Sequence, residues 1–184
     1  MISNYLVNKM IESKIITESD RALYLYGIRE AGVIFQNIVV TLAFGILFQN
    51  FFQTVVFLVA YIPLRSFAGG YHAASAKRCS VYSLGLILIL EFYFSHRYLV
   101  AFRYLFSMLI IAICIIYKVS PLQSASKPLS SEEKYYYALV TKKVLFIECS
   151  LIVIFSILNL SAIVDGISMA LIVEGILLTV GIFI

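Results

Sequence analysis

Hydrophobic residues gather into six runs along the chain, and short polar stretches separate them. A helix that crosses the roughly 30 Å hydrocarbon core of a bilayer needs about 20 residues, and shorter spans are accommodated by local thinning. The runs therefore predict six transmembrane helices. We place them at residues 32–48, 52–64, 81–94, 102–117, 144–160 and 163–183.

An amphipathic pattern precedes the first run, over residues 1–30. Thr17 followed by Asp20 three residues later fits a capping box, which predicts a second helix through Leu23 and Tyr26. Two interpretations are open: helices that lie in the headgroup plane, or a polar-faced approach to the first span. The first helix is predicted from an apolar face of Ile2, Tyr5, Leu6 and Met10 opposite Asn4, Asn8, Lys9 and Glu12.

Composition supports the same class of protein. Hydrophobic residues make up 62% of the 184 residues, charged residues only 13%, and the mean hydropathy is +0.98. Soluble globular domains are far more polar, so they are excluded. We predict an all-α polytopic membrane protein in which residues 1–184 form one membrane domain. The N-terminus lacks the basic start and apolar core of a signal peptide, so we expect none to be removed.

Basic residues are distributed unevenly between the predicted loops. Twelve lie before the first span, between the second and third, or between the fourth and fifth, whereas Arg97 and Arg103 lie on the other side. The positive-inside rule then places both termini, and the segment 65–79, in the cytosol of a multi-pass cell-membrane protein. The twelve are Lys9, Lys14, Arg21, Arg29, Arg65, Lys77, Arg78, Lys118, Lys127, Lys134, Lys142 and Lys143.

The longest polar stretch, residues 118–143, is predicted to be a basic cytosolic loop with a turn. Pro128 excludes a helix that runs through it. Tyr135, Tyr136 and Tyr137 suit the headgroup level, where aromatic side chains gather.

The segment 65–80, between the second and third spans, contains the residues best suited to catalysis. Gly69 and Gly70 permit a turn closed to other residues, although a plain flexible turn also uses glycine. Cys79 follows Lys77 and Arg78 at the expected start of the third span. Neighbouring cations and a helix N-terminus both favour the thiolate, which is the nucleophilic form.

His72 precedes Cys79 by seven residues and is a candidate general base. On one straight helix the two would lie roughly 10 Å apart along the axis, so the pairing requires a turn at the glycines and a helix that begins near Ser75. Coincidence is the alternative. A metal site is disfavoured because His96, the second of two histidines, is predicted on the opposite side.

The other cysteines and the intramembrane acids need separate explanations. Cys114 and Cys149 lie in apolar runs and are interpreted as packing residues, and an odd number of cysteines argues against a disulfide framework. Glu174 falls near the middle of the last span, where a charge is costly. It is expected to line a groove or to sit protonated, in preference to pairing with an arginine. Glu91 and Glu148 are expected near the membrane boundary, in contact with water.

Arg65, Gly69-Gly70-Tyr71-His72 and Cys79, together with Lys127-Pro128 in the basic loop, resemble the accessory gene regulator B family over nearly the whole chain. That resemblance implies a membrane cysteine endopeptidase of Gram-positive quorum sensing, which trims a short propeptide and helps to form a cyclic thiolactone or lactone. It also implies that Cys79 is the nucleophile and His72 its base, and that Arg65 and Gly70 are motif positions needed for activity.

The expected partners are a short amphipathic propeptide and the lipid bilayer. Neither a cofactor nor a nucleic acid is implied, and a homo-oligomer is possible. Two other classes remain open: a small transporter or exporter, suggested by Glu174 and six spans, and a non-catalytic partner of another membrane protein.

Overall fold

The computed structural model describes residues 2–70, 76–97, 102–123 and 129–183, and these ranges are helical almost throughout. The described ranges contain no strand, and one isolated bridge joins Gly69 to Leu122. The predicted all-α class is confirmed. The elements are α1 (Ile2–Glu12), the 3-10 turn η1 (Glu18–Asp20), α2 (Arg21–Leu47), α3 (Phe51–Ala68), α4 (Ala76–Ser95), α5 (Phe102–Val119), α6 (Ser131–Ile157) and α7 (Ser161–Phe183).

Each of the six hydrophobic runs coincides with one helix, from α2 to α7. Among the described residues, three helices are long and apolar enough to cross a membrane: Glu18–Leu47, Phe51–Ala68 and Ser161–Phe183. A shorter apolar stretch, Val81–Ser95, lies in α4. The chain is therefore a helical membrane protein, and the count of six spans stays a prediction.

Two predicted loops are shorter than expected. Residues 65–68 belong to α3 and residues 76–80 to α4, so helix occupies both ends of the segment 65–80. The predicted loop 118–143 is wrong from residue 131 onward, because α6 begins at Ser131. Ser130 caps that helix: its hydroxyl accepts from the Glu133 amide at 3.2 Å and its own amide donates to the Glu133 carboxylate at 2.9 Å. This capping box, visible in the sequence as Ser-x-x-Glu, marks the start of α6.

The chain divides into two compact units, Met1–Val40 and Thr41–Ile184. In the first unit, the predicted capping box at Thr17 is confirmed: the Thr17 amide donates to the Asp20 carboxylate at 3.4 Å. The helix that follows does not stop near Glu30, because α2 is continuous from Arg21 to Leu47. Residues 21–30 thus belong to the same helix as the first hydrophobic run, and an interfacial position for the N-terminal residues stays a prediction.

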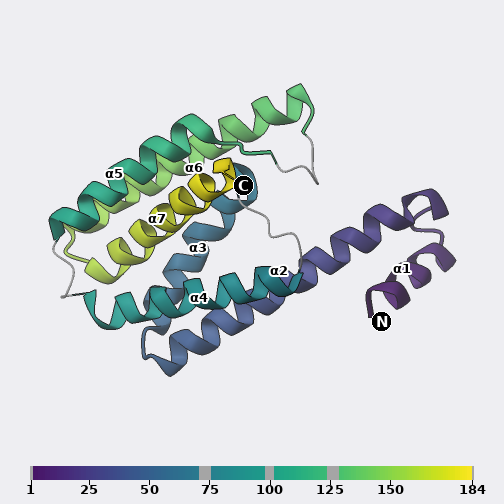
Figure 1. The fold of residues 1–184 in the computed structure, drawn as a ribbon, viewed down its shortest axis with the longest axis horizontal. Helices are drawn as coiled ribbons and strands as arrows, with labels where there is room; N and C mark the ends of the chain where they lie inside the picture. The colour runs from purple at the N-terminus through teal and green to yellow at the C-terminus, as the bar shows by residue number, and fades with distance from the viewer. Residues whose placement is uncertain (1, 71–75, 98–101, 124–128, 184) are drawn as a thin grey trace. The chain divides into compact units, whose positions relative to one another are not determined.

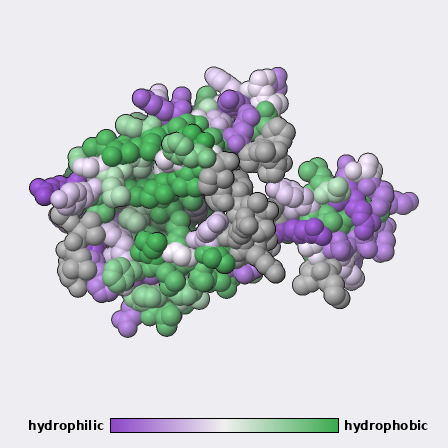
Figure 2. Space-filling model, viewed as in Figure 1, coloured by the Kyte–Doolittle hydropathy of each residue, from purple (hydrophilic) through white to green (hydrophobic). Residues whose placement is uncertain are grey.

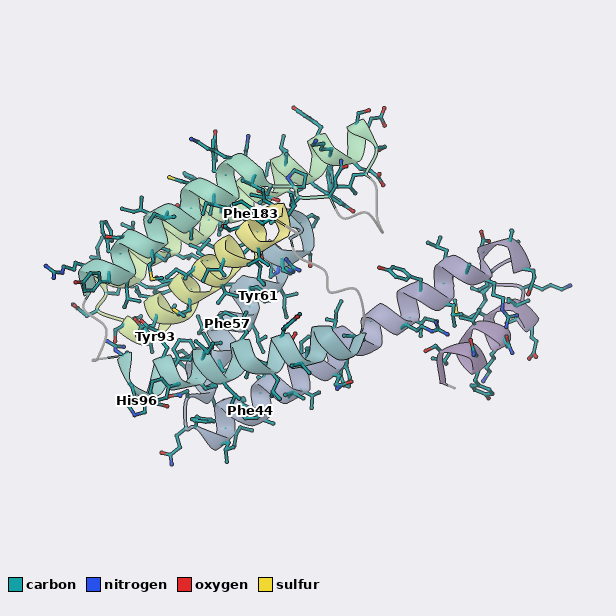
Figure 3. The ribbon with its side chains drawn as sticks, in the orientation of Figure 1. Phe44, Phe57, Tyr61, Tyr93, His96 and Phe183 are labelled. Atoms are coloured by element: carbon teal, nitrogen blue, oxygen red, sulfur yellow. The ribbon has the colours of Figure 1, made fainter. Side chains whose placement is uncertain are left out.

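Helix α7 is the central element of the second unit, where it packs against α3, α5 and α6 (Figure 1). Two clusters of buried apolar side chains lie along it. The first includes Phe57 and Tyr61 of α3, whose rings stack at 5.2 Å (Figure 3), together with Leu90 of α4 and Ala170 of α7. The second contains Leu64, Ala68, Ile116, Leu145, Leu171 and Leu178. The clusters follow one another along α3, so that helix contacts both.

Glycines on α7 let neighbouring helices approach closely. A Cβ on Gly175 would lie 2.7 Å from Ala112 Cβ on α5, and one on Gly166 would lie 2.7 Å from Val56 Cγ1 on α3. Helix pairs in membranes depend on such small residues, because packing rather than hydrophobic burial drives their association. The two crossings explain why α7 fits between its neighbours.

Large hydrophobic side chains are also abundant on the outer surfaces of the helices. Hydrophobic residues cover much of the visible face of the second unit (Figure 2), whereas the surface around α1 is largely hydrophilic. Soluble monomers rarely expose apolar patches of this extent, while a lipid-facing surface requires them. Examples on α5 and α6 are Phe106, Ile111, Phe146, Ile147 and Ile157, each at least half exposed.

Candidate functional site

The candidate site begins where α3 ends. Gly69 caps this helix with a φ of 77°, and Gly70 follows with a φ of 117°. Both values lie in the region that L side chains rarely adopt, so the turn requires glycine at both positions. A Cβ on either residue would also overlap another group, the Leu122 carbonyl oxygen at Gly69 and the Arg65 guanidinium at Gly70. The two glycines thus have the backbone conformation that a bend requires, and the fold-back that would bring His72 to Cys79 stays a prediction.

The segment after α5 supports this turn from one side. The Leu122 amide donates to the Ala68 carbonyl oxygen at 2.9 Å, and Leu122 pairs with Gly69 as a parallel bridge. A cis peptide bond joins Ser120 to the buried Pro121 just before it. The end of α3 is therefore tied to the start of the α5–α6 connection, an arrangement that hydropathy alone does not indicate.

Arg65 supports the turn from the other side. Its Nη1 donates to the Gly69 carbonyl oxygen, one turn further along the chain. The same atom lies 3.7 Å from Oε1 of Glu174 on α7. The Arg65 side chain is 21% exposed and that of Glu174 is completely buried. Arg65 thus connects the Gly69–Gly70 turn to the most buried helix of the unit.

The preference for Glu174 lining a groove or sitting protonated was therefore misplaced, because an arginine lies beside it. Sequence reasoning missed this pair since 109 positions separate the two residues and no local spacing relates them. A signal was nevertheless present: an intramembrane carboxylate and a motif arginine at the end of an apolar helix each need a partner of opposite charge.

Cys79 is the fourth residue of α4, which begins at Ala76. A helix start near Ser75 was the condition for bringing His72 toward Cys79, and it stays a prediction, because residues 71–75 are not among those that the structure describes. His72 lies outside the described residues. Lys77 and Arg78 belong to the same first turn as Cys79, and their catalytic support stays a prediction.

Basic residues also accompany the beginning of α6. A shallow hollow on this helix is lined by Tyr135, Leu139, Lys142, Lys143 and Phe146, among others. Its surface combines exposed apolar side chains with two lysines, and Lys142 also lies over the Tyr117 ring at 4.7 Å. Such a surface suits an amphipathic peptide that carries acidic groups. Lys127 and Pro128 lie outside the described residues.

Glu91 and Glu148 contradict the expectation that water accounts for them, since they are 0% and 5% exposed. Glu91 accepts from Thr54 Oγ1 at 2.7 Å and from Asn50 Nδ2 at 3.2 Å, so the turn between α2 and α3 satisfies it. A buried carboxylate avoids the free-energy cost of lost hydration only when such donors contact it. Glu148 faces the second apolar cluster beside Leu145, and within the described part of the chain its Oε2 has no hydrogen-bond partner.

The remaining cysteines differ from each other. Cys149 packs against the second apolar cluster, in agreement with the expectation. Cys114 is exposed on α5, so the interpretation of Cys114 as a residue that packs inside the protein was wrong. The ranges that the structure describes contain no group of three metal-ligating side chains.

Taken together, the fold and this site define a helical membrane protein in which an ion pair and two glycines fix the start of a segment that contains a histidine and a cysteine. The profile of the accessory gene regulator B family matches residues 2–178, and the chain belongs to that family. It is thus a membrane protein related to quorum sensing, from a family regarded as peptidase-like. No curated protein and no solved structure matches the chain.

Proposed function

We propose that the chain is a cysteine endopeptidase that cleaves a short autoinducer propeptide at the cytosolic face of the membrane and promotes its cyclisation. The observation that supports this most directly is the break between α3 and α4. The chain leaves α3 through two positive-φ glycines, and the described part of α4 begins at Ala76. Cys79 is the fourth residue of that part, and His72 precedes it by seven positions in the sequence.

The start of α4 offers two advantages to a nucleophilic thiol. The helix dipole stabilises a thiolate near its positive end, and Lys77 and Arg78 add positive charge to the same turn. The first four N–H groups of a helix also have no partner within that helix. Cys79 is the fourth residue of α4. Backbone amides beside the thiol are therefore suited to stabilise an oxyanion on the scissile carbonyl.

In the proposed reaction, the Cys79 thiolate attacks a propeptide carbonyl and a carbon–sulfur bond forms. The peptide C–N bond then breaks, and the His72 imidazolium protonates the leaving amine of the C-terminal fragment. The N-terminal part remains as a thioester. An internal thiol or hydroxyl of the propeptide next attacks this thioester, which yields the cyclic thiolactone or lactone and frees Cys79. Exclusion of water at the membrane boundary would favour cyclisation over hydrolysis.

Basic residues gather before and within the first part of α2, around the end of α3 and the first residues of α4, and from the end of α5 into the first half of α6, and this excess supports a cytosolic site and cytosolic termini. The transporter alternative loses its main support, because Arg65 accounts for the buried charge of Glu174. We therefore propose a single function.

The test uses the full-length protein in liposomes with a synthetic propeptide that contains an internal cysteine. A short open reading frame next to the gene is the natural source of the propeptide sequence. Mass spectrometry follows the C-terminal fragment, the cyclic product and a thioester adduct on the enzyme. Cys79→Ala should abolish all three, and His72→Ala should reduce cleavage by at least 100-fold.

Matched controls are available in the same chain. Cys114→Ala and His96→Ala replace the same residue types outside the candidate site, and both should cleave at the rate of the unmodified protein. His96 stacks on Phe92 at 4.5 Å near the far end of α4. Cleavage by Cys79→Ala at an unchanged rate would refute the proposed function.

A further inference from the structure

The Glu174 side chain places a carboxylate on an otherwise apolar face of α7. Leu171 and Leu178 lie three and four positions away, on the same helical face, and both belong to the second apolar cluster. Glu174 is fully buried within this face. Within the described residues, neither of its carboxylate oxygens has a hydrogen-bond partner. The Arg65 guanidinium lies beside it, with Nη1 3.7 Å from Oε1.

Arg65 in turn contacts both residues of the turn that starts the catalytic segment. Its Nη1 donates to the Gly69 carbonyl oxygen. The position that a Gly70 Cβ would take overlaps the same nitrogen and lies 3.5 Å from Glu174 Oε1. Glu174, Arg65 and the Gly69–Gly70 backbone therefore form one continuous set of contacts. Leu122 contacts the turn from the opposite side through the backbone.

We propose that Glu174 is a positioning residue of the peptidase. Its buried carboxylate holds the Arg65 guanidinium against the Gly69 carbonyl oxygen and so fixes the direction in which the chain leaves α3 toward His72. This inference rests on the proposed function and deepens it. A permanently charged guanidinium suits the role, because arginine keeps its proton under all physiological conditions and its several donors can contact two groups at once.

The proposal separates two roles within one site. Cys79 and His72 would perform the chemistry. Glu174 would affect the reaction through Arg65, without contacting either catalytic residue. Loss of the Glu174 charge would release Arg65 and let the turn adopt other directions, so His72 would occupy its reactive position less often. The chemical step should then slow, while binding of the propeptide, which involves other surfaces, should change little.

The experiment measures kcat and KM for propeptide cleavage by Glu174→Gln in liposomes. We expect kcat to fall at least tenfold and KM to change less than threefold. A neutral maleimide should still alkylate Cys79 to completion, in a background that lacks Cys114 and Cys149. Complete alkylation and a monodisperse elution profile in detergent together report a folded protein with an accessible nucleophile.

Two comparisons identify the route of the effect. Arg65→Gln should lower kcat to a similar extent, and Arg65→Gln/Glu174→Gln should lose no more than Arg65→Gln alone, because one residue acts through the other. The control is Glu91→Gln, an equally buried glutamate at the opposite end of the bundle, which should retain kcat. If Glu174→Gln does not fold, Glu174→Asp preserves the charge but shortens the side chain, and it should show the same loss of kcat with unchanged KM.

A kcat of Glu174→Gln within threefold of the unmodified protein would overturn the proposal, as would additive losses in the double variant. These outcomes are distinct from failure of the proposed function. If Cys79→Ala is inactive while Glu174→Gln is fully active, the peptidase assignment holds and the positioning role falls. If Cys79→Ala still cleaves, both fall.

Discussion

Replacement of Gly70 by alanine perturbs the turn in two ways. The residue has a φ of 117°, which an L side chain tolerates poorly. The added Cβ would overlap Arg65 Nη1 and lie 3.2 Å from Arg65 Cζ, whereas unstrained contacts between such atoms are about 3.5 Å or longer. The guanidinium must therefore move away or the turn must change its backbone angles.

The magnitude follows from these two alternatives. Backbone strain of this kind costs about 1–3 kcal/mol. Movement of Arg65 would instead lengthen its 3.7 Å contact with the fully buried Glu174, and removing one partner of a buried ion pair costs about 3–5 kcal/mol. The chain should take the cheaper alternative and change the turn. If the loss of 1–3 kcal/mol falls on the transition state, kcat/KM decreases by about 5- to 150-fold.

The assay compares Gly70→Ala with Gly85→Ala at equal amounts of membrane-inserted protein. Gly85 lies within α4, and no heavy atom outside its own helix backbone comes within 4 Å of the Cβ position. Alanine there should stabilise the helix by up to about 1 kcal/mol and leave cleavage unchanged. Cleavage by Gly70→Ala within twofold of the unmodified protein would refute the argument that the conformation of this turn controls the site.

Three further predictions concern stability, measured as unfolding in mixed detergent micelles. Gly175→Ala should destabilise the protein by about 1–3 kcal/mol, because its Cβ would lie 2.7 Å from Ala112 Cβ and force α5 from α7; an unchanged midpoint would contradict that close crossing. Ser130→Ala should cost about 1 kcal/mol through loss of the α6 cap, and equal stability would show that the cap is dispensable. Asn50→Ala should cost about 1–3 kcal/mol by removing a donor to buried Glu91, unlike a substitution at an exposed polar position.

Hydropathy alone located the apolar parts of the helices α2 to α7. Each run of apolar residues became a helix because the backbone polar groups of a membrane segment must pair with each other, and a helix satisfies them locally. Capping motifs in the sequence also indicated where helices begin. The capping box at Thr17 is present, and the one at Ser130, which was overlooked, would have placed the start of α6 correctly.

The candidate site was only partly accessible from sequence. The glycine pair predicted a turn, since few residues other than glycine adopt positive φ, and the structure contains it at Gly69 and Gly70. Cys79 lies in α4, whereas the expected start of this helix near Ser75 falls on residues that the structure does not describe and stays a prediction. The two proposed catalytic residues themselves rest on residue chemistry and on the family to which the chain belongs.

The sequence by itself determined the helical membrane class, the approximate helix positions and the need for glycine at the turn, because all three depend on properties of residues close together in the chain. Tertiary structure decided which distant groups meet. Pairing of Arg65 with Glu174, of Leu122 with Gly69 and of Asn50 with Glu91 depends on how the helices pack. A buried charge needs a partner, but only the packed bundle determines which residue provides it.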